Sequence, residues 1–179
     1  KYIHQIDKGV DLEKLNEIKS FVWNHLYCKS KPETAQQLRT ILNRPIRVCG
    51  VVQNTGAPGG GPFWVRENDT DSLQIVEAAQ IDMNNVSQKK SLEEATHFNP
   101  VDVVCGVRDY QGKKFDLFDF RDANSGFITQ KSYDGLPIKV LELPGLWNGA
   151  MARWNTIFIE VPLSTFSPVK TVNDLIKKV

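Results

Sequence analysis

With 179 residues, 41% of them hydrophobic and 24% charged, the chain is long enough to bury one sizeable core, and its length favours one domain over two. The 22 basic and 21 acidic residues leave a formal net charge of +1, so no long-range field draws nucleic acid or an anionic membrane surface, and we expect neither as a partner. No apolar stretch reaches the roughly 20 residues that a membrane helix needs.

The first part of the chain predicts helices. Apolar residues recur at helical spacing from Leu12 onward, after Asp11, which is a good N-cap, and Leu26 extends the same face. A second, shorter helix is expected after Ser30 and Pro32, and it ends before Pro45 because proline pushes the preceding residue out of the α region. We therefore interpret residues 1–45 as a helical lead-in and 46–179 as the sheet-containing core of the same domain.

From Ile46 onward the pattern changes to strands. Four apolar runs are too continuous for a sheet with one wet face, and we expect them to be central: Ile46–Val52, Ser72–Glu77, Val101–Val107 and Ile157–Val161. They predict an α/β (or α+β) fold with a mixed, largely parallel sheet and flanking helices. Further strands are expected at Phe63–Arg66, Phe127–Gln130 and Ile138–Leu143, and a last helix at Val172–Lys178.

A glycine-rich loop, Gly56–Gly61, connects two of these strands. Glycine-rich backbone can close around a phosphate with its N–H groups, which makes Gly59 and Gly60 candidates for substrate binding. The loop does not end in Gly-Lys-Ser/Thr, Pro58 within it and Pro62 after it remove donors, and a strand-like segment follows, so it is not a Walker loop. Two interpretations remain open: a ligand-shaped loop, or a long hairpin connection that needs positive φ angles.

Two later stretches carry further candidates. Leu143–Trp154 keeps no clean period and is expected to form a turn and a short helix, with Trp147 and Trp154 as core anchors and Asn148 as the ligand candidate. Lys113–Asp122 alternates apolar and charged residues, as a half-exposed strand would, so we interpret its carboxylates as a solvated sheet face.

The cysteines and histidines show no metal-ligand spacing. Cys28, Cys49 and Cys105 form no Cys-x-x-Cys pair, and the three histidines share no ligand spacing with them or with one another. Cys49 and Cys105 lie in apolar strand-like runs, where we expect free cysteine to be buried as a small hydrophobe. We therefore expect no metal site in this chain and a reducing, cytoplasmic setting.

Three short blocks resemble the carboxyl-terminal half of the catalytic, GT-A-like domain in UDP-N-acetylhexosamine and UDP-sugar pyrophosphorylases. In chain order they are Arg47–Val52, similar to the family's Val-Gly-Val-Val strand; Leu73–Ile81, similar to its Val-Val-Glu-Tyr-Ser-Glu-Ile strand; and Phe166–Lys170, Phe-Ser-Pro-Val-Lys, which follows the strand-like run Ile157–Val161. A weaker match, Phe98–Asp102, lies where the family has an asparagine that contacts the sugar.

The resemblance implies a role for four residues. Gly50 would let backbone approach the sugar nucleotide, Glu77 and Asn99 would hold the sugar, and Lys170 would stabilise phosphate charge during catalysis. Departures from the family pattern are Pro100 after the asparagine, and Ala78 and Gln80 in place of the tyrosine and the second glutamate. If the resemblance holds, Gly50, Glu77 and Lys170 should line one concave surface at the carboxyl-terminal edge of the sheet.

The family's opening signature, Leu-x-x-Gly-Gly-x-Gly-Thr-Arg-Leu followed by lysine, does not occur in the chain. We therefore expect the missing amino-terminal part of the same protein as a partner, a nucleotide or sugar phosphate as ligand, and Mg²⁺ only in the active full-length enzyme; this chain alone would show no pyrophosphorylase activity. The alternative is a non-catalytic binding or interaction domain. The whole chain, Leu143–Met151 included, also looks like an uncharacterised bacterial family, and that likeness implies no activity.

Overall fold

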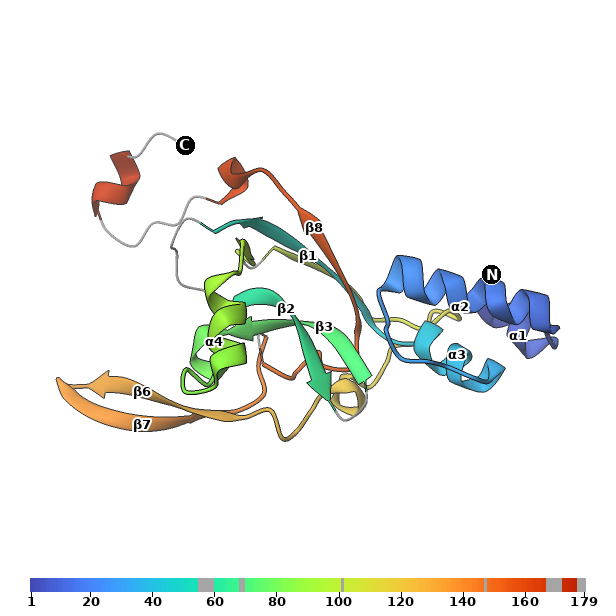
Figure 1. Cartoon of the computed structure of the whole chain (residues 1–179), viewed down its shortest axis with the longest axis horizontal. Helices are drawn as coiled ribbons and strands as arrows, with labels where there is room; N and C mark the ends of the chain where they lie inside the picture. Colours follow the sequence, from blue (N-terminus) through green and yellow to red (C-terminus); the bar gives the residue numbers. More distant parts are fainter. Residues whose placement is uncertain (55–59, 68–69, 101, 147, 167–171, 177–179) are drawn as a thin grey trace.

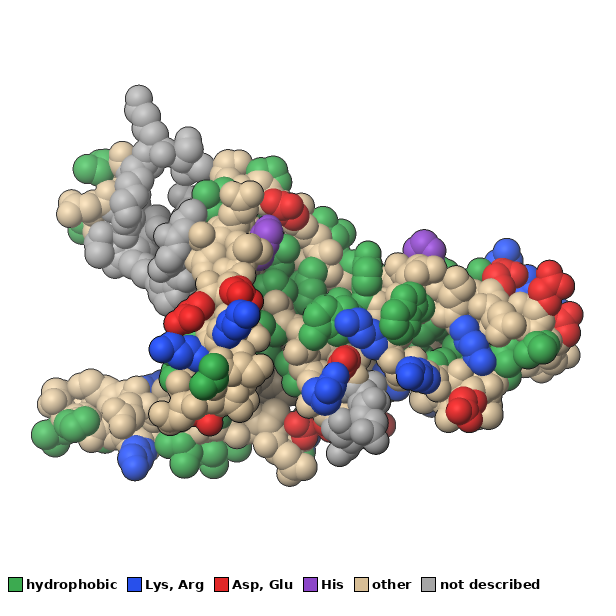
Figure 2. Space-filling model, viewed as in Figure 1, with side chains coloured by type: hydrophobic (Ala, Val, Ile, Leu, Met, Phe, Trp, Pro, Cys, Tyr) green, Lys and Arg blue, Asp and Glu red, His purple; other side chains and the backbone are tan. Residues whose placement is uncertain are grey.

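The computed structural model describes residues 1–54, 60–67, 70–100, 102–146, 148–166 and 172–176. Helices α1, α2 and α3 gather at one end, the sheets occupy the middle, and the β6–β7 hairpin projects from the opposite side (Figure 1). On the face shown in Figure 2, acidic and basic side chains are interspersed, in keeping with the balanced composition.

The helical end consists of α1 (Tyr2–Asp7), α2 (Leu12–Leu26) and α3 (Ala35–Leu42). The predicted cap of α2 is confirmed, because the Asp11 carboxylate accepts the N–H of Lys14 at 2.8 Å. The second helix begins later than expected: Thr34 caps it and forms a capping box with Gln37, so Ser30 and Pro32 lie in the connection.

The core of this end is a cluster of Ile18 and Val22 from α2 with Leu38 and Ile41 from α3. These four side chains lie on the faces that the helical spacing predicts. An ion pair between Asp7 and Arg39, with the Arg39 Nε at 2.6 Å from the Asp7 Oδ1, ties the end of α1 to α3, and the Tyr110 hydroxyl lies within 3.3 Å of the same carboxylate.

This ion pair predicts a loss of stability in acid. The hydrogen bond from Arg39 holds the pKa of the Asp7 carboxyl below its usual range. The unfolded chain therefore binds more protons in acid, and the contribution of Asp7, present above the unfolded pKa, is lost as pH falls through the folded one. Asp7→Asn should remove part of the fall in unfolding free energy between about pH 5 and pH 2 in urea titrations. An unchanged pH dependence in the variant would contradict this role.

Strand β1 (Ile46–Gln53) is the centre of the main sheet. On one side it pairs in parallel with β8 (Asn155–Glu160), from Ile46 opposite Asn155 to Val51 opposite Glu160. On the other side it pairs antiparallel with β5 (Val103–Gly106) and then with β4 (His97–Phe98).

The expectation of a largely parallel sheet is therefore wrong, although the mixed α/β class is confirmed. Among the described strands β1 and β8 form the one parallel pair, and the other pairs are antiparallel. A parallel pair needs a long crossover, whereas two of the antiparallel pairs are hairpins of strands that follow each other directly in the chain. Continuous apolar runs indicated burial on both faces and did not indicate strand direction.

Two hairpins lie beside the main sheet. The first is β2 (Gly60–Glu67) with β3 (Thr70–Glu77), so the run Ser72–Glu77 belongs to a two-stranded ribbon and is not central as expected. The second is β6 (Phe127–Tyr133) with β7 (Leu136–Glu142), joined by a tight turn in which Asp134 and Gly135 have φ angles of 49° and 80°.

The remaining elements are short. Helix α4 (Val86–Glu93) begins after Asn85, whose side chain accepts the N–H groups of Ser87 and Gln88, and 3₁₀ turns occupy Ala78–Gln80, Leu117–Phe120, Leu163–Thr165 and Val172–Ile176. Lys113–Asp122 thus contains a 3₁₀ turn and is not a strand, because the Asp116 carboxylate accepts the N–H of Phe118 and starts the turn. The described part of Leu143–Trp154 is a series of turns without a helix, and the last helix is of the 3₁₀ type.

Burial corrects one further expectation and confirms another. Trp154 is buried, as predicted, whereas Trp147 lies outside the described residues. Cys49 is fully buried and burial raises the pKa of its thiol, but Cys105 is exposed, as are its neighbours Val104 and Gly106 in β5. Within the described residues, no helix is long and apolar enough to cross a membrane.

Candidate functional site

Four of the predicted site residues lie together. The Asn99 side chain is 2% exposed, and its Nδ2 donates to the carbonyl of Gly50 at 2.6 Å. The Asn99 backbone N–H donates to the carbonyl of Gly60 at 2.8 Å, and Gly60 is paired with Glu77 across the β2–β3 hairpin. We call these residues, Gly50, Gly60, Glu77 and Asn99, the glycine–asparagine cluster.

Gly50 is a glycine because another segment approaches it closely. Its N–H donates to the carbonyl of Asp102 at 2.7 Å, and a Cβ at this position would lie 3.0 Å from the Cβ of Asp102. The space next to Gly50 is therefore occupied by Asp102 of the same chain. The requirement for a small residue, which the sequence suggested, follows from this packing.

Two predicted site residues, Gly59 and Lys170, lie outside the described residues. The expectation that Lys170 shares one surface with Gly50 and Glu77 therefore stays a prediction. Glu77 itself ends β3, is half-buried, and donates its backbone N–H to the Oε1 of Gln80 at 3.0 Å.

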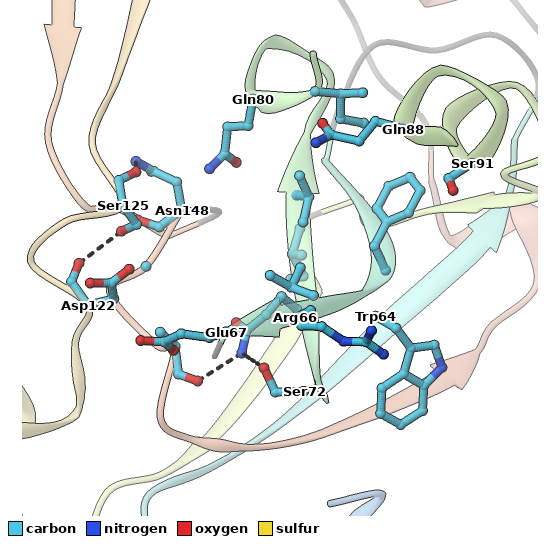
Figure 3. Close-up of a pocket in the computed structure, with 18 of the residues that line it drawn as sticks. Trp64, Arg66, Glu67, Ser72, Gln80, Gln88, Ser91, Asp122, Ser125 and Asn148 are labelled. Atoms are coloured by element: carbon cyan, nitrogen blue, oxygen red, sulfur yellow. Dashed lines mark hydrogen bonds between the residues drawn. The ribbon is translucent and has the colours of Figure 1, made fainter. Parts of the chain in front are cut away.

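A pocket of about 540 Å³ lies beside the cluster (Figure 3). Its walls are the β2–β3 ribbon, helix α4 and the turns that contain Asp122 and Asn148. The alternation of side chains along the paired strands puts Phe63, Val65 and Glu67 of β2 on one face of the ribbon with Ser72, Gln74 and Val76 of β3. Glu77 belongs to the opposite face.

Asn148 is the predicted site residue that lines this pocket. Its Nδ2 donates to the carbonyls of Leu143 and Ser125, at 3.2 and 3.3 Å, and its Oδ1 accepts the N–H of Gly145 at 3.0 Å. Gly149 follows with a φ of 83°, and a Cβ there would lie 1.5 Å from the Ser125 Oγ. The Asn148 amide thus shapes the turn that forms one wall of the pocket.

Arg47 lies behind the pocket and is the most buried cation of the described residues, at 2% exposure. Its Nε donates to the Thr156 Oγ1 and its Nη2 to the Gln74 Oε1, both at 2.9 Å. Burial lowers the pKa of the guanidinium, and no carboxylate in the described part of the chain forms an ion pair with it.

Sequence reasoning missed Arg47 and most of the pocket. Gln74, Gln80 and Gln88 are single amides in three different elements, and no motif connects them. The start of α4 did carry a signal, because Asn85 is a good N-cap. Asp122 was noticed, but as part of a supposed strand.

Comparisons with known proteins give a family and a weak structural likeness. The family model described as "Domain of unknown function (DUF4301)" matches residues 1–179, and no curated protein matches the sequence. Among solved structures, a mutant of UDP-glucose pyrophosphorylase from Leishmania major in complex with UDP-glucose has 18% identity and a TM-score of 0.46. The open and closed structures of that enzyme give 17% identity and a TM-score of 0.42. Each match covers 92% of this chain and 39% of the other.

Proposed function

The chain belongs to the DUF4301 family, and we propose that it is the sugar-binding, carboxyl-terminal portion of a nucleotidyltransferase related to the sugar-nucleotide pyrophosphorylases. The observation that carries the proposal is the glycine–asparagine cluster. Its members come from four separate segments: Gly50, Glu77 and Asn99 from segments that resemble the family, and Gly60 from the glycine-rich loop. Asn99 donates hydrogen bonds to Gly50 and Gly60, and Gly60 pairs with Glu77.

In such a reaction, an oxygen of a sugar 1-phosphate attacks the α-phosphate of a nucleoside triphosphate and diphosphate leaves. Positioning and cationic side chains supply most of the rate enhancement. In our proposal Glu77 and Asn99 hold the sugar beside the backbone of Gly50, and Lys170 stabilises the phosphate charge. The amino-terminal part of the same protein would grip the nucleotide phosphates, so the chain would not be active alone.

Mg²⁺ would assist the full-length enzyme by neutralising phosphate charge. The described residues do not fit a metal site of their own, because they contain no group of three or more His, Cys, Asp or Glu side chains placed to hold an ion. We therefore assign no metal ligand among the described residues and propose that such ligands come from another part of the protein.

The alternative, a non-catalytic binding domain, is favoured by one observation. Gly50 packs directly against Asp102 and donates its N–H to the Asp102 carbonyl. The glycine that the family would place beside a ligand is therefore in contact with another segment of this chain. Turnover assays on the full-length protein with nucleoside triphosphates and sugar 1-phosphates separate the two. Binding of a nucleotide sugar without turnover would support the alternative.

Lys170→Ala should weaken binding of a nucleotide sugar to the full-length protein by about 1.5–3 kcal/mol, the scale of a charge-assisted hydrogen bond. The measurement is calorimetry with UDP-glucose and UDP-N-acetylglucosamine. Lys31→Ala, at an exposed lysine of the α2–α3 connection, is the matched control and should leave the dissociation constant unchanged. An equal dissociation constant in the Lys170 variant would remove this residue from the proposed site.

A further inference from the structure

The pocket between the β2–β3 ribbon and α4 is separate from the glycine–asparagine cluster. Ser72, Gln74 and Val76 face it from β3, while Glu77, at the next position along the strand, belongs to the other face of the ribbon. A ligand in the pocket therefore meets a different set of side chains from a ligand at the cluster.

The buried guanidinium of Arg47 orients the first polar groups of the pocket. Because guanidinium only donates, the Gln74 Oε1 must face Arg47, at 2.9 Å from its Nη2. The Gln74 Nε2 then donates to the Ala152 carbonyl at 2.8 Å and to the Ser72 Oγ at 3.0 Å. Since the Ser72 oxygen accepts this bond, its own proton is left to donate toward the pocket.

Two more amides are oriented in the same way. The Gln80 Oε1 accepts the backbone N–H of Glu77 at 3.0 Å, and the Gln88 Oε1 accepts that of Asp82 at 2.9 Å. The NH₂ groups of both side chains therefore remain as donors. Figure 3 shows Gln80 and Gln88 at one side of the pocket, with Asp122 and Ser125 at another.

The acceptors of the pocket are the carboxylates of Glu67 and Asp122. Neither forms an ion pair with a lysine or arginine of the described chain. Arg66 also lines the pocket, but its charge is compensated by Asp71, to which it is bonded at 2.8 and 3.1 Å. Two uncompensated carboxylates repel a phosphate or another anion. The Phe63 ring, on the same face of the ribbon, adds an apolar surface.

We propose that this pocket binds a neutral, polyhydroxylated ligand, a carbohydrate unit without a phosphate group. Hydroxyl groups both donate and accept, so they match oriented donors at Ser72, Gln80 and Gln88 together with carboxylate acceptors at Glu67 and Asp122. The volume of about 540 Å³ lies in the range of small-molecule sites. The inference does not depend on the nucleotide-sugar proposal, because none of the four residues of the glycine–asparagine cluster lines the pocket.

The test is a titration followed in ¹H–¹⁵N spectra, in which glutamine side-chain NH₂ groups give their own signals. Glucose, galactose, N-acetylglucosamine and maltose are added separately, and inorganic phosphate serves as the anionic comparison. At least one sugar should shift the NH₂ signals of Gln80 and Gln88 saturably, phosphate should not, and the exposed Gln36 and Gln53 serve as internal references.

Ser72→Ala should weaken the sugar's affinity about fivefold, since one hydrogen bond to the ligand is lost. Ser132→Ala, at an exposed serine of the β6–β7 hairpin, is the matched control. No shift with any of the sugars, a shift with phosphate instead, or an unchanged affinity in Ser72→Ala would each overturn the proposal. Since the ligands carry no nucleotide, these outcomes are distinct from success or failure at the glycine–asparagine cluster.

Discussion

Asn99→Asp should lower the free energy of unfolding by about 3–5 kcal/mol at neutral pH, which is among the largest effects of a near-isosteric change in this protein. The change removes the Nδ2 donor and puts a carboxylate oxygen near the Gly50 carbonyl, 2.6 Å from the present Nδ2, in a site that is 2% exposed. A buried carboxylate oxygen that faces a carbonyl oxygen is repelled by it and has lost its hydration.

Urea unfolding at two pH values tests this expectation. Burial raises the pKa of the introduced carboxyl, so its penalty is present above the unfolded pKa and shrinks in acid, where the protonated group can donate to Gly50 again. Asn84→Asp, at an exposed asparagine before α4, should change stability by less than about 0.5 kcal/mol. A comparably small effect at Asn99 would mean that the bond from its side-chain amide to Gly50 does not stabilise the fold.

Arg47→Ala should cost about 3–5 kcal/mol of unfolding free energy. The variant loses the buried side chain and leaves the Gln74 Oε1 and Thr156 Oγ1 without their donor. Arg47→Met retains most of the volume without the charge, so the difference between the two variants separates packing from hydrogen bonding.

Arg153→Ala, at an exposed arginine shortly before β8, is the matched control for denaturant unfolding and should stay within about 0.5 kcal/mol of the wild type. If Arg47→Ala lowers the free energy of unfolding no more than Arg153→Ala does, the Arg47 guanidinium does not stabilise the sheet. Arg47→Met should also shift the NH₂ signals of Gln74, because the Oε1 of this amide loses the donor that orients it.

Local patterns predicted the helical end well. Asp11 and the apolar spacing from Leu12 define α2, and the side chains Ile18, Val22, Leu38 and Ile41 form the cluster that amphipathic faces require. Both signals act within a few residues: a cap bonds to the N–H three residues on, and an apolar stripe repeats every turn. The positions of β1, β3 and β8 were readable for the same reason, because β-branched runs indicate a strand wherever it pairs.

Strand pairing and strand direction could not be predicted from the sequence. Ser72–Glu77 and Ile157–Val161 looked alike as apolar runs, yet the first lies in a two-stranded ribbon and β8 pairs in parallel with β1. Lys113–Asp122 alternated like a strand, but the Asp116 side chain competes for the backbone and starts a turn. The pairing of a strand depends on which segment, distant in sequence, lies beside it. Local periodicity carries no information about that segment.

By itself, the sequence determined α2 and the positions of β1, β3 and β8, because each of these depends on a residue's own chemistry and its near neighbours. The candidates Gly50, Glu77 and Asn99 came from the resemblance of short segments to the pyrophosphorylases. Only the tertiary structure decided that Asn99 joins Gly50 to Gly60, and that Arg47 orients Gln74 and Ser72 at a pocket on the other face of the ribbon. The physical reason is the direction of hydrogen bonds: a side chain's donors and acceptors become defined only when partners from distant segments arrive.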